Sequence, residues 1–200
     1  MKERPILFSA PMGRALLDGS KTQTRRIFQP ERMTWSSEGF YETHAFRKGE
    51  LVVTGGGPFA PKDWLHYCPY GQLGDRLWVR EHYRVCDGLD AKPPRDLCPA
   101  ARLWYEADTP HQAGYGKFRP GMFMCRWMSR ITLEITSVRV ERLQDISRGD
   151  CMAEGCPFPN IAGKTDPVGW YRDLWEEING PGSWALNPWV WCVEFSKVKP

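Results

Sequence analysis

Residues 130–143 read RITLEITSVRVERL and carry the clearest β-strand pattern in the chain. Apolar residues alternate with polar ones over 131–135, as in a strand with one buried face. The alternation changes phase at 136–137 and resumes over 138–140. A change of phase predicts a β-bulge, which bends a strand and helps a sheet to close into a barrel. The chain is therefore expected to be built on a curved sheet.

Other strands are predicted on both sides of this one. The segment 74-GDRLWVREHYRV-85 opens with a Gly-Asp turn and then alternates, and 188-PWVWCVEF-195 places large apolar residues on one face. The basic segment that follows Gly19 is rich in threonine, which also favours a strand. The full set of expected strands covers 21–27, 50–54, 74–85, 102–106, 130–143 and 188–195.

Three short helices complete the expected fold. A helix over 9–18 has Pro11 in its first turn and Gly19 at its end. A second, over 147–155, begins with a capping box and ends at a glycine, and a third begins after Asp166 with an apolar spacing of three and four residues. Short strands, a bulge and short helices predict an α+β protein, a small β-barrel decorated by helices.

Two segments break this regular pattern. Residues 29–73 and 86–121 are dense in glycine, proline and polar turn residues. Long connections without regular structure are uncommon in a compact domain and are usually functional or mobile. We therefore expect residues 1–200 to form a single domain in which these two segments are insertions or lids.

Composition limits the classes of function. The 27 Lys and Arg residues against 24 Asp and Glu residues give a net charge of +3, so any contact with nucleic acid must come from a local patch. No apolar run is long enough for a membrane span or for the core of a signal peptide. We expect a cytoplasmic protein without a membrane partner, and the oligomeric state stays open.

The cysteines argue against a disulfide framework and against a zinc ribbon. There are seven, an odd number, and no two are spaced as C-x-x-C. We expect reduced thiols and neither a metal nor another cofactor, although a mixed site joining Cys68 to His66 or His82 stays open as an alternative. The ten tryptophans suit large packing surfaces and also allow a platform for stacking a base.

The segment 19-GSKTQTRRI-27 gathers the residues best suited to a site. Side chains that can bind phosphate through charge, a guanidinium fork or a hydroxyl are Lys21, Thr22, Thr24, Arg25 and Arg26. If Lys21 is buried against Thr24, a lowered lysine pKa would let it activate the hydroxyl as a nucleophile. In an ideal strand these two side chains point to opposite faces, so their cooperation requires a turn or bulge after Gly19. The simpler interpretation is an exposed basic strand end.

Glu154 is a second candidate. It lies in the last turn of the helix predicted over 147–155, where a carboxylate is unfavourable against the helix dipole. Pairing with Lys21 or Arg26 would explain its position. An ordinary surface glutamate is the alternative.

The basic and aromatic run 123-FMCRWMSR-130 is a third candidate. Arg126 and Arg130 could follow a nucleic-acid backbone while Trp127 stacks a base. The alternative is that Trp127 packs in the core and the two arginines are solvated.

These elements, in this order, resemble the ASCH family of the PUA-like superfamily, small β-barrels linked to RNA and nucleoside recognition. The chain is especially similar to longer, tryptophan-rich ASCH-like proteins of bacteriophages and prophages, with openings like PILFSAPM and endings like NPWVW. The resemblance implies a small PUA-like barrel with helical decorations. The segments that carry it are 16-LLDGSKTQTRR-26, 74-GDRLWV-79, 131-ITLEITSVRVERL-143, 143-LQDISRGDCMAEG-155 and 189-WVWCVEF-195.

One branch of this family, the small bacterial acetylcytidine amidohydrolases, has an assigned chemistry. That branch uses a Lys and a Thr of a K-T-x-T motif together with a Glu from the helix after the central strand. The matching positions here are Lys21, Thr24 and Glu154. The resemblance implies that Lys21 activates Thr24 or a water while Glu154 passes a proton to the departing amine, with Arg26 orienting the substrate or stabilising the oxyanion. This chain is considerably longer and has Arg25 where that branch carries Ile.

Three functional hypotheses follow from the resemblance. The first, which we favour, is hydrolysis of an acyl group from a modified nucleoside such as acetylcytidine. The second is non-catalytic binding of RNA or a modified nucleotide, with phosphate contacts from the basic residues of 21–26 and 126–130 and a stacking tryptophan. The third is ribonuclease activity through similar basic residues.

Overall fold

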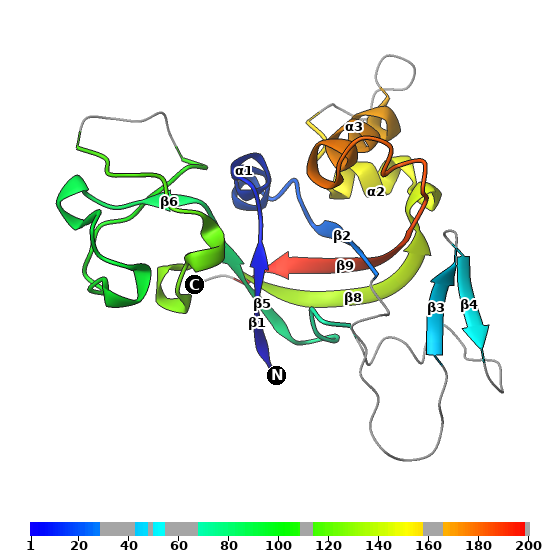
Figure 1. The fold of residues 1–200 in the computed structure, drawn as a ribbon, viewed down its shortest axis with the longest axis horizontal. Helices are drawn as coiled ribbons and strands as arrows, with labels where there is room; N and C mark the ends of the chain where they lie inside the picture. Colours follow the sequence, from blue (N-terminus) through cyan, green and yellow to red (C-terminus); the bar gives the residue numbers. More distant parts are fainter. Residues whose placement is uncertain (29–42, 48–49, 55–67, 109–113, 158–165, 199–200) are drawn as a thin grey trace.

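The computed structural model describes residues 1–28, 43–47, 50–54, 68–108, 114–157 and 166–198. Its centre is a five-stranded mixed sheet in the order β1-β5-β8-β9-β2, shown in Figure 1. β1 runs parallel to β5, and the other pairs are antiparallel. These strands are β1 (Glu3–Leu7), β2 (Gln23–Ile27), β5 (Arg76–Arg80), β8 (Thr132–Arg142) and β9 (Trp189–Lys197).

Two further strand pairs and several short helices surround this sheet. β3 (Thr43–Arg47) pairs with β4 (Glu50–Thr54), and β6 (Tyr83–Arg84) pairs with β7 (Trp104–Tyr105). The α-helices are α1 (Ala10–Asp18), α2 (Arg148–Ala153) and α3 (Pro167–Asn179). The short 3-10 helices are η3 (Asp87–Leu89), η4 (Pro94–Asp96), η5 (Gly121–Phe123), η6 (Arg126–Met128) and η7 (Leu143–Asp145). The expected α+β class is confirmed.

The strands that the structure describes do not form the closed barrel expected from the sequence. β1 and β2 each have a hydrogen-bonded neighbour on one side only, so they are the edges of an open sheet. The reason lies in the connection, because β1 leads into α1 and α1 leads into β2. The helix therefore joins the two edges in place of a ladder of backbone hydrogen bonds.

The bulge predicted in the long central strand is confirmed. The register of β8 against β9 shifts between Ile135 and Ser137, where the apolar alternation changes phase. Before the shift, Leu133 and Ile135 are buried in the main core, which also contains Trp191 and Phe195 of β9. The change of phase thus lets β8 bend while its apolar residues stay on the core side.

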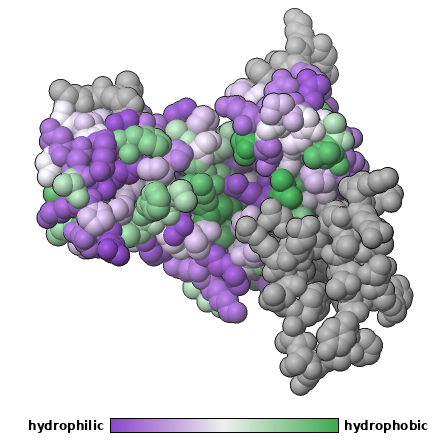
Figure 2. Space-filling model, in the orientation of Figure 1, coloured by the Kyte–Doolittle hydropathy of each residue, from purple (hydrophilic) through white to green (hydrophobic). Residues whose placement is uncertain are grey.

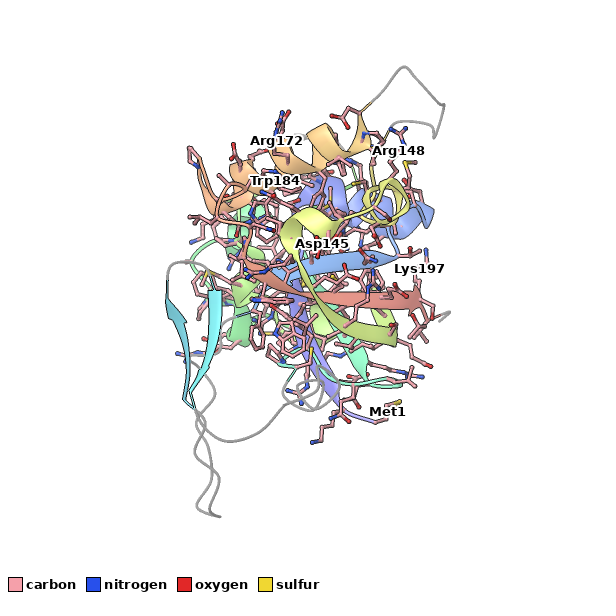
Figure 3. All side chains as sticks on the ribbon, turned by 90° about the vertical axis from the view of Figure 1, so that its right-hand side faces the viewer. Met1, Asp145, Arg148, Arg172, Trp184 and Lys197 are labelled. Atoms are coloured by element: carbon pink, nitrogen blue, oxygen red, sulfur yellow. The ribbon has the colours of Figure 1, made fainter. Side chains whose placement is uncertain are left out.

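The three α-helices begin at the predicted signals, and α1 and α2 end next to the predicted glycines. Gly19 closes α1 in the left-handed conformation with φ 84°, and Asp166 accepts a hydrogen bond from the backbone of the first turn of α3. Ser147 and Asp150 form the predicted capping box of α2. Figures 1 and 3 show α1, α2 and α3 on one side of the sheet. A second core cluster, which includes Trp175, lies where α2 and α3 meet β9.

β1 was not among the predicted strands. It is five residues long and contains Pro5, which lacks a backbone N–H and weakens a strand pattern. Proline is tolerated on an edge strand because one side of that strand makes no ladder. The parallel partner of β1, β5, is more than 70 residues away in sequence and gives no local signal.

The two segments expected to be irregular have different outcomes. Most of 29–73 lies outside the described residues, but the strand expected at 50–54 is present as β4. The described part of 86–121 contains 3-10 helices and β7 and belongs to a unit with its own small core. Buried members of that core are Tyr83, Val85, Leu97, Met124 and Met128. The strand expected at 102–106 is thus present as β7, the rest of the described segment is as irregular as predicted, and its own core is what the sequence did not predict.

No helix in the described part of the chain has both the length and the apolar character needed to cross a bilayer.

Figure 2 shows apolar side chains gathered near the centre of one face, where Figure 1 places β1 and α1. The pocket described next lies in this region.

Candidate functional site

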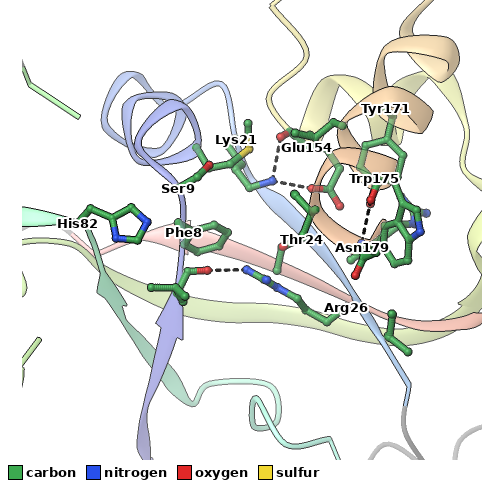
Figure 4. Close-up of a pocket in the computed structure, with 16 residues that line it drawn as sticks. Phe8, Ser9, Lys21, Thr24, Arg26, His82, Glu154, Tyr171, Trp175 and Asn179 are labelled. Atoms are coloured by element: carbon green, nitrogen blue, oxygen red, sulfur yellow. Dashed lines mark hydrogen bonds and ion pairs between the residues drawn. The ribbon is translucent and has the colours of Figure 1, made fainter. Parts of the chain in front are cut away.

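A pocket of about 240 Å³ lies between the two edge strands of the sheet. Its walls are formed by the end of β1, the start of α1, strand β2 and one face of α3. The side chain of His82 also lines it (Figure 4). Ligand pockets usually measure about 300–1,000 Å³, so this one suits a small ligand that is only partly enclosed. The gap left by the open sheet is therefore where the candidate site lies.

Lys21 and Glu154 meet in this pocket. Lys21 Nζ lies 2.6 Å from Glu154 Oε2 and donates to the backbone carbonyl of Glu154 at 2.8 Å. The backbone brings them together, because Lys21 and Glu154 form an isolated β-bridge and Thr22 N–H donates to Ala153 O at 2.8 Å. Of the two partners suggested for Glu154 by the sequence, Lys21 is the one that it contacts.

Thr24 lies in the same pocket as this pair. The turn required after Gly19 is present, since Lys21 precedes the first residue of β2 and its N–H donates to Ala15 O at 2.9 Å. Strand alternation therefore does not separate Lys21 from Thr24. Figure 4 shows the two side chains and Glu154 around one space.

Burial controls the electrostatics of the pair. Lys21 is 4% exposed and Glu154 is 3% exposed. Burial lowers the pKa of Lys21, the charge and hydrogen bond of Glu154 oppose this change, and the positive charges of Arg26 and Arg25 add to it. Oε1 of Glu154 is buried and has no hydrogen-bond donor among the described residues. That oxygen can accept a proton or a hydrogen bond from a ligand.

The two arginines of β2 have different roles. Arg25 borders the pocket, but its guanidinium turns to Glu141 at 2.7 Å and to Asp150 at 3.4 Å. Arg26 donates from Nη2 to the backbone carbonyl of Leu7 at 2.7 Å, across the gap between the edge strands. Only Arg26 therefore presents a guanidinium to the pocket without a carboxylate partner among the described residues.

Aromatic side chains that the sequence did not single out complete the walls. Phe8 lies between the two cations (Figure 4), with Lys21 Nζ 5.6 Å and Arg26 Cζ 5.3 Å from its ring centre. Tyr171 and Trp175 of α3 also line the pocket. Burial, together with the charge of Glu154, raises the pKa of Tyr171, so its hydroxyl stays protonated. The i, i+4 spacing of these two residues predicted an apolar helix face but gave no sign of a pocket.

The structure does not bring the remaining predicted residues into the pocket. Thr22 is exposed on the chain just before β2 and does not line the pocket. Arg126 pairs with Glu3 at 2.9 Å, and Trp127 is 38% exposed.

Arg130 also lies outside the pocket and is held by two carboxylates. It pairs with Glu81 at 2.9 Å and with Asp108 at 2.7 Å, and its guanidinium stacks on Tyr105 at 3.9 Å. The basic run 123–130 thus neutralises carboxylates of its own chain. A local pattern gave no information on these distant partners.

Metal ligation was left open by the sequence. No group of three or more His, Cys, Asp or Glu side chains in the described ranges is arranged to hold a metal ion. His66 lies outside those ranges. Nδ1 of His82 accepts a hydrogen bond from the backbone N–H of Gly121 at 3.0 Å, and Cys68 is buried.

Comparison with protein-family models, with curated proteins and with solved structures finds no match for this chain. Its function must therefore be inferred from the chemistry of the pocket. That chemistry comprises a buried ammonium–carboxylate pair, a threonine hydroxyl, a guanidinium and aromatic walls. Together these groups can move a proton, stabilise a developing oxyanion and hold a planar ring.

Proposed function

We propose that the protein is an amidohydrolase that removes an acyl group from the exocyclic amine of a modified nucleoside, with acetylcytidine as the first candidate substrate. We also propose that its open sheet is a variant of the ASCH core of the PUA-like superfamily, to which the sequence is similar. The observation that carries the proposal is the buried Lys21–Glu154 pair beside Thr24 in a pocket. A buried ion pair is a poor way to gain stability, so its presence favours a chemical role.

Two routes are compatible with this geometry, and both begin with Lys21 and Glu154 sharing a proton. In the first, Glu154 takes a proton from a water whose oxygen attacks the acyl carbon. The ammonium of Lys21 stabilises the oxyanion, the C–N bond breaks, and the proton passes to the departing nitrogen. The products are the free amine of the base and a carboxylic acid.

In the second route Thr24 is the nucleophile. Neutral Lys21, made accessible by its lowered pKa, takes the hydroxyl proton, and the threonine oxygen attacks the acyl carbon. Protonated Glu154 gives its proton to the departing nitrogen, and the resulting acyl ester is hydrolysed by water. Trapping the acyl ester on Thr24 by mass spectrometry distinguishes this route from direct attack by water.

The walls of the pocket support a ligand that contains a planar ring. Phe8 offers an apolar surface flanked by two cations, and Trp175 lies on the side formed by α3. The unpartnered Oε1 of Glu154 suits the N–H of an exocyclic amide. A nucleobase carrying an acylated amine presents both features in one ligand.

RNA binding along 123–130 is not proposed as an alternative. The guanidinium groups of Arg126 and Arg130 already face carboxylates, and a phosphate backbone would have to displace them. Ribonuclease activity through these residues is set aside for the same reason.

The direct test is hydrolysis of acetylcytidine and of an N-acylated adenosine, followed by chromatography. Wild-type protein should release the free nucleoside, and Lys21→Met, Thr24→Val and Glu154→Gln should each lower turnover by about 10²-fold or more. Lys197→Met is the matched control, because Lys197 Nζ donates to the carbonyl of Leu17 on the surface and Lys197 does not line the pocket. Folded wild-type protein that binds these nucleosides without cleaving them would show a binding module instead.

A further inference from the structure

The cations that line the pocket differ in how their charge is compensated. Lys21 pairs with Glu154 at 2.6 Å, and Arg25 is held by carboxylates outside the pocket. Among the described residues no carboxylate pairs with Arg26, whose Nη2 donates to the Leu7 carbonyl. Its Nε is buried and has no partner there. Within the part of the chain that the structure describes, the wall of the pocket therefore carries a positive charge, that of Arg26, without a paired carboxylate.

Arg26 is held in a fixed position. Its guanidinium lies over Phe8, and the bond to Leu7 O anchors one nitrogen at the end of β1. An arginine has five N–H donors; because Nε–H is buried and Nη2 donates to Leu7 O, the donors that can face a ligand are those on Nη1 and the second one on Nη2. A guanidinium fork held in this way matches the geometry of a phosphate or carboxylate group.

His82 supplies a second donor at the wall of the same pocket. Because Nδ1 accepts from the backbone N–H of Gly121, the neutral ring carries its proton on Nε2. The ring also packs against Phe118, with centres 5.0 Å apart, which restricts its orientation. Figure 4 shows His82 on the opposite side of Phe8 from Thr24. Nε2–H is thus the ring donor left for a ligand.

We propose that Arg26, assisted by His82, binds the phosphate of a nucleotide, so that the substrate is an acylated nucleoside monophosphate and not a free nucleoside. This inference rests on the proposed function for the base-binding part of the pocket. A neutral nucleoside would leave the partly buried Arg26 charge without a counter-ion, whereas a phosphate compensates it. The acyl group then lies at the Lys21–Glu154 pair while the phosphate lies at Arg26.

The test is calorimetric titration with cytidine, cytidine 5′-monophosphate and cytidine 3′-monophosphate, which bind without turnover. One of the two monophosphates should bind roughly tenfold to a hundredfold more tightly than cytidine. Arg26→Gln should abolish that preference and leave the affinity for cytidine unchanged, and His82→Phe should reduce it in part. The control is Arg80→Gln, since Arg80 stacks on Trp78 at 4.7 Å but does not line the pocket.

The outcomes separate the two proposals. Equal affinity for cytidine and both monophosphates overturns the phosphate subsite and leaves the proposed function standing. No binding of any of the three contradicts both. If Arg26→Gln lowers turnover of acetylcytidine but keeps the preference for a monophosphate, Arg26 serves the oxyanion and the inference is wrong.

Discussion

Lys21→Met should destabilise the protein much more than loss of a surface lysine would. Exposed ion pairs contribute about 0–1 kcal/mol, but Lys21 and Glu154 are 4% and 3% exposed. Removing one member of a buried pair costs about 3–5 kcal/mol, because the other charge remains in the interior without compensation. In the variant, Glu154 loses the ammonium 2.6 Å from Oε2, and its Oε1 already has no described donor.

A second substitution should reverse most of this loss. In Lys21→Met/Glu154→Met neither charge remains, and replacing a buried ion pair by apolar residues of similar volume is often neutral or stabilising. The free energy of unfolding should therefore return to near the wild-type value or exceed it, although amide hydrolysis should be absent. Stability and activity would then be separated at the same two residues.

Urea unfolding at neutral pH, followed by tryptophan fluorescence, measures both variants. A loss below about 1 kcal/mol for Lys21→Met would show that solvent screens the pair and that the buried geometry is wrong. A double variant no more stable than the single one would show that packing, and not charge, accounts for the loss. Should the single variant fail to fold, the double variant alone still decides the point.

Three further predictions concern residues around the site. Burial alone would raise the pKa of Asp150, but hydrogen bonds from Ser147 hold that pKa well below its usual range. The ionised carboxylate therefore contributes to the free energy of unfolding fully above about pH 4, and this contribution is lost as the pH falls below that value. Asp150→Asn should flatten the acid side of a plot of the urea midpoint against pH, and an unchanged slope would refute this. Burial raises the pKa of Cys151 to about 12, so its thiol should resist iodoacetamide in the folded protein at about pH 8, and rapid labelling in peptide mass maps would contradict the structure. Gly155 has φ +92°, and an added Cβ would lie 3.0 Å from Ala15 Cβ, so Gly155→Ala should cost about 1–2 kcal/mol in thermal unfolding; a variant as stable as wild type would contradict this geometry.

The features predicted from sequence are those that local rules determine. The bulge in β8 follows from a phase change within a few residues, and the caps of α2 and α3 follow from neighbouring side chains. The pairing of Glu154 was anticipated because a carboxylate near a helix C-terminus needs a partner. Whether Lys21 could be that partner depended on a turn of the backbone after Gly19. The sequence analysis required such a turn, and the structure contains it.

The features that were missed depend on contacts between distant segments. β1 is held by β5, and the open sheet results from how α1 connects its two edge strands. Neither feature produces a periodic pattern in the sequence. The basic run 123–130 resembled a nucleic-acid groove because the carboxylates that neutralise it come from other parts of the chain. Charge patterns in one segment therefore indicate a surface only when the partners of each charge are known.

The open sheet and the candidate site have one structural cause. A sheet edge exposes backbone donors and acceptors that must be paired or covered, and here α1 holds β1 and β2 apart at the place where a barrel would close. The Arg26 side chain crosses that gap to the carbonyl of Leu7, so a side chain makes the contact that a backbone ladder makes in a closed barrel. Because Arg26 has no carboxylate partner among the described residues and Lys21 meets Glu154 beside it, the gap becomes a polar pocket with aromatic walls. A ligand that compensates the charge of Arg26 would also connect the two edges, and its binding should therefore raise the stability of the whole sheet.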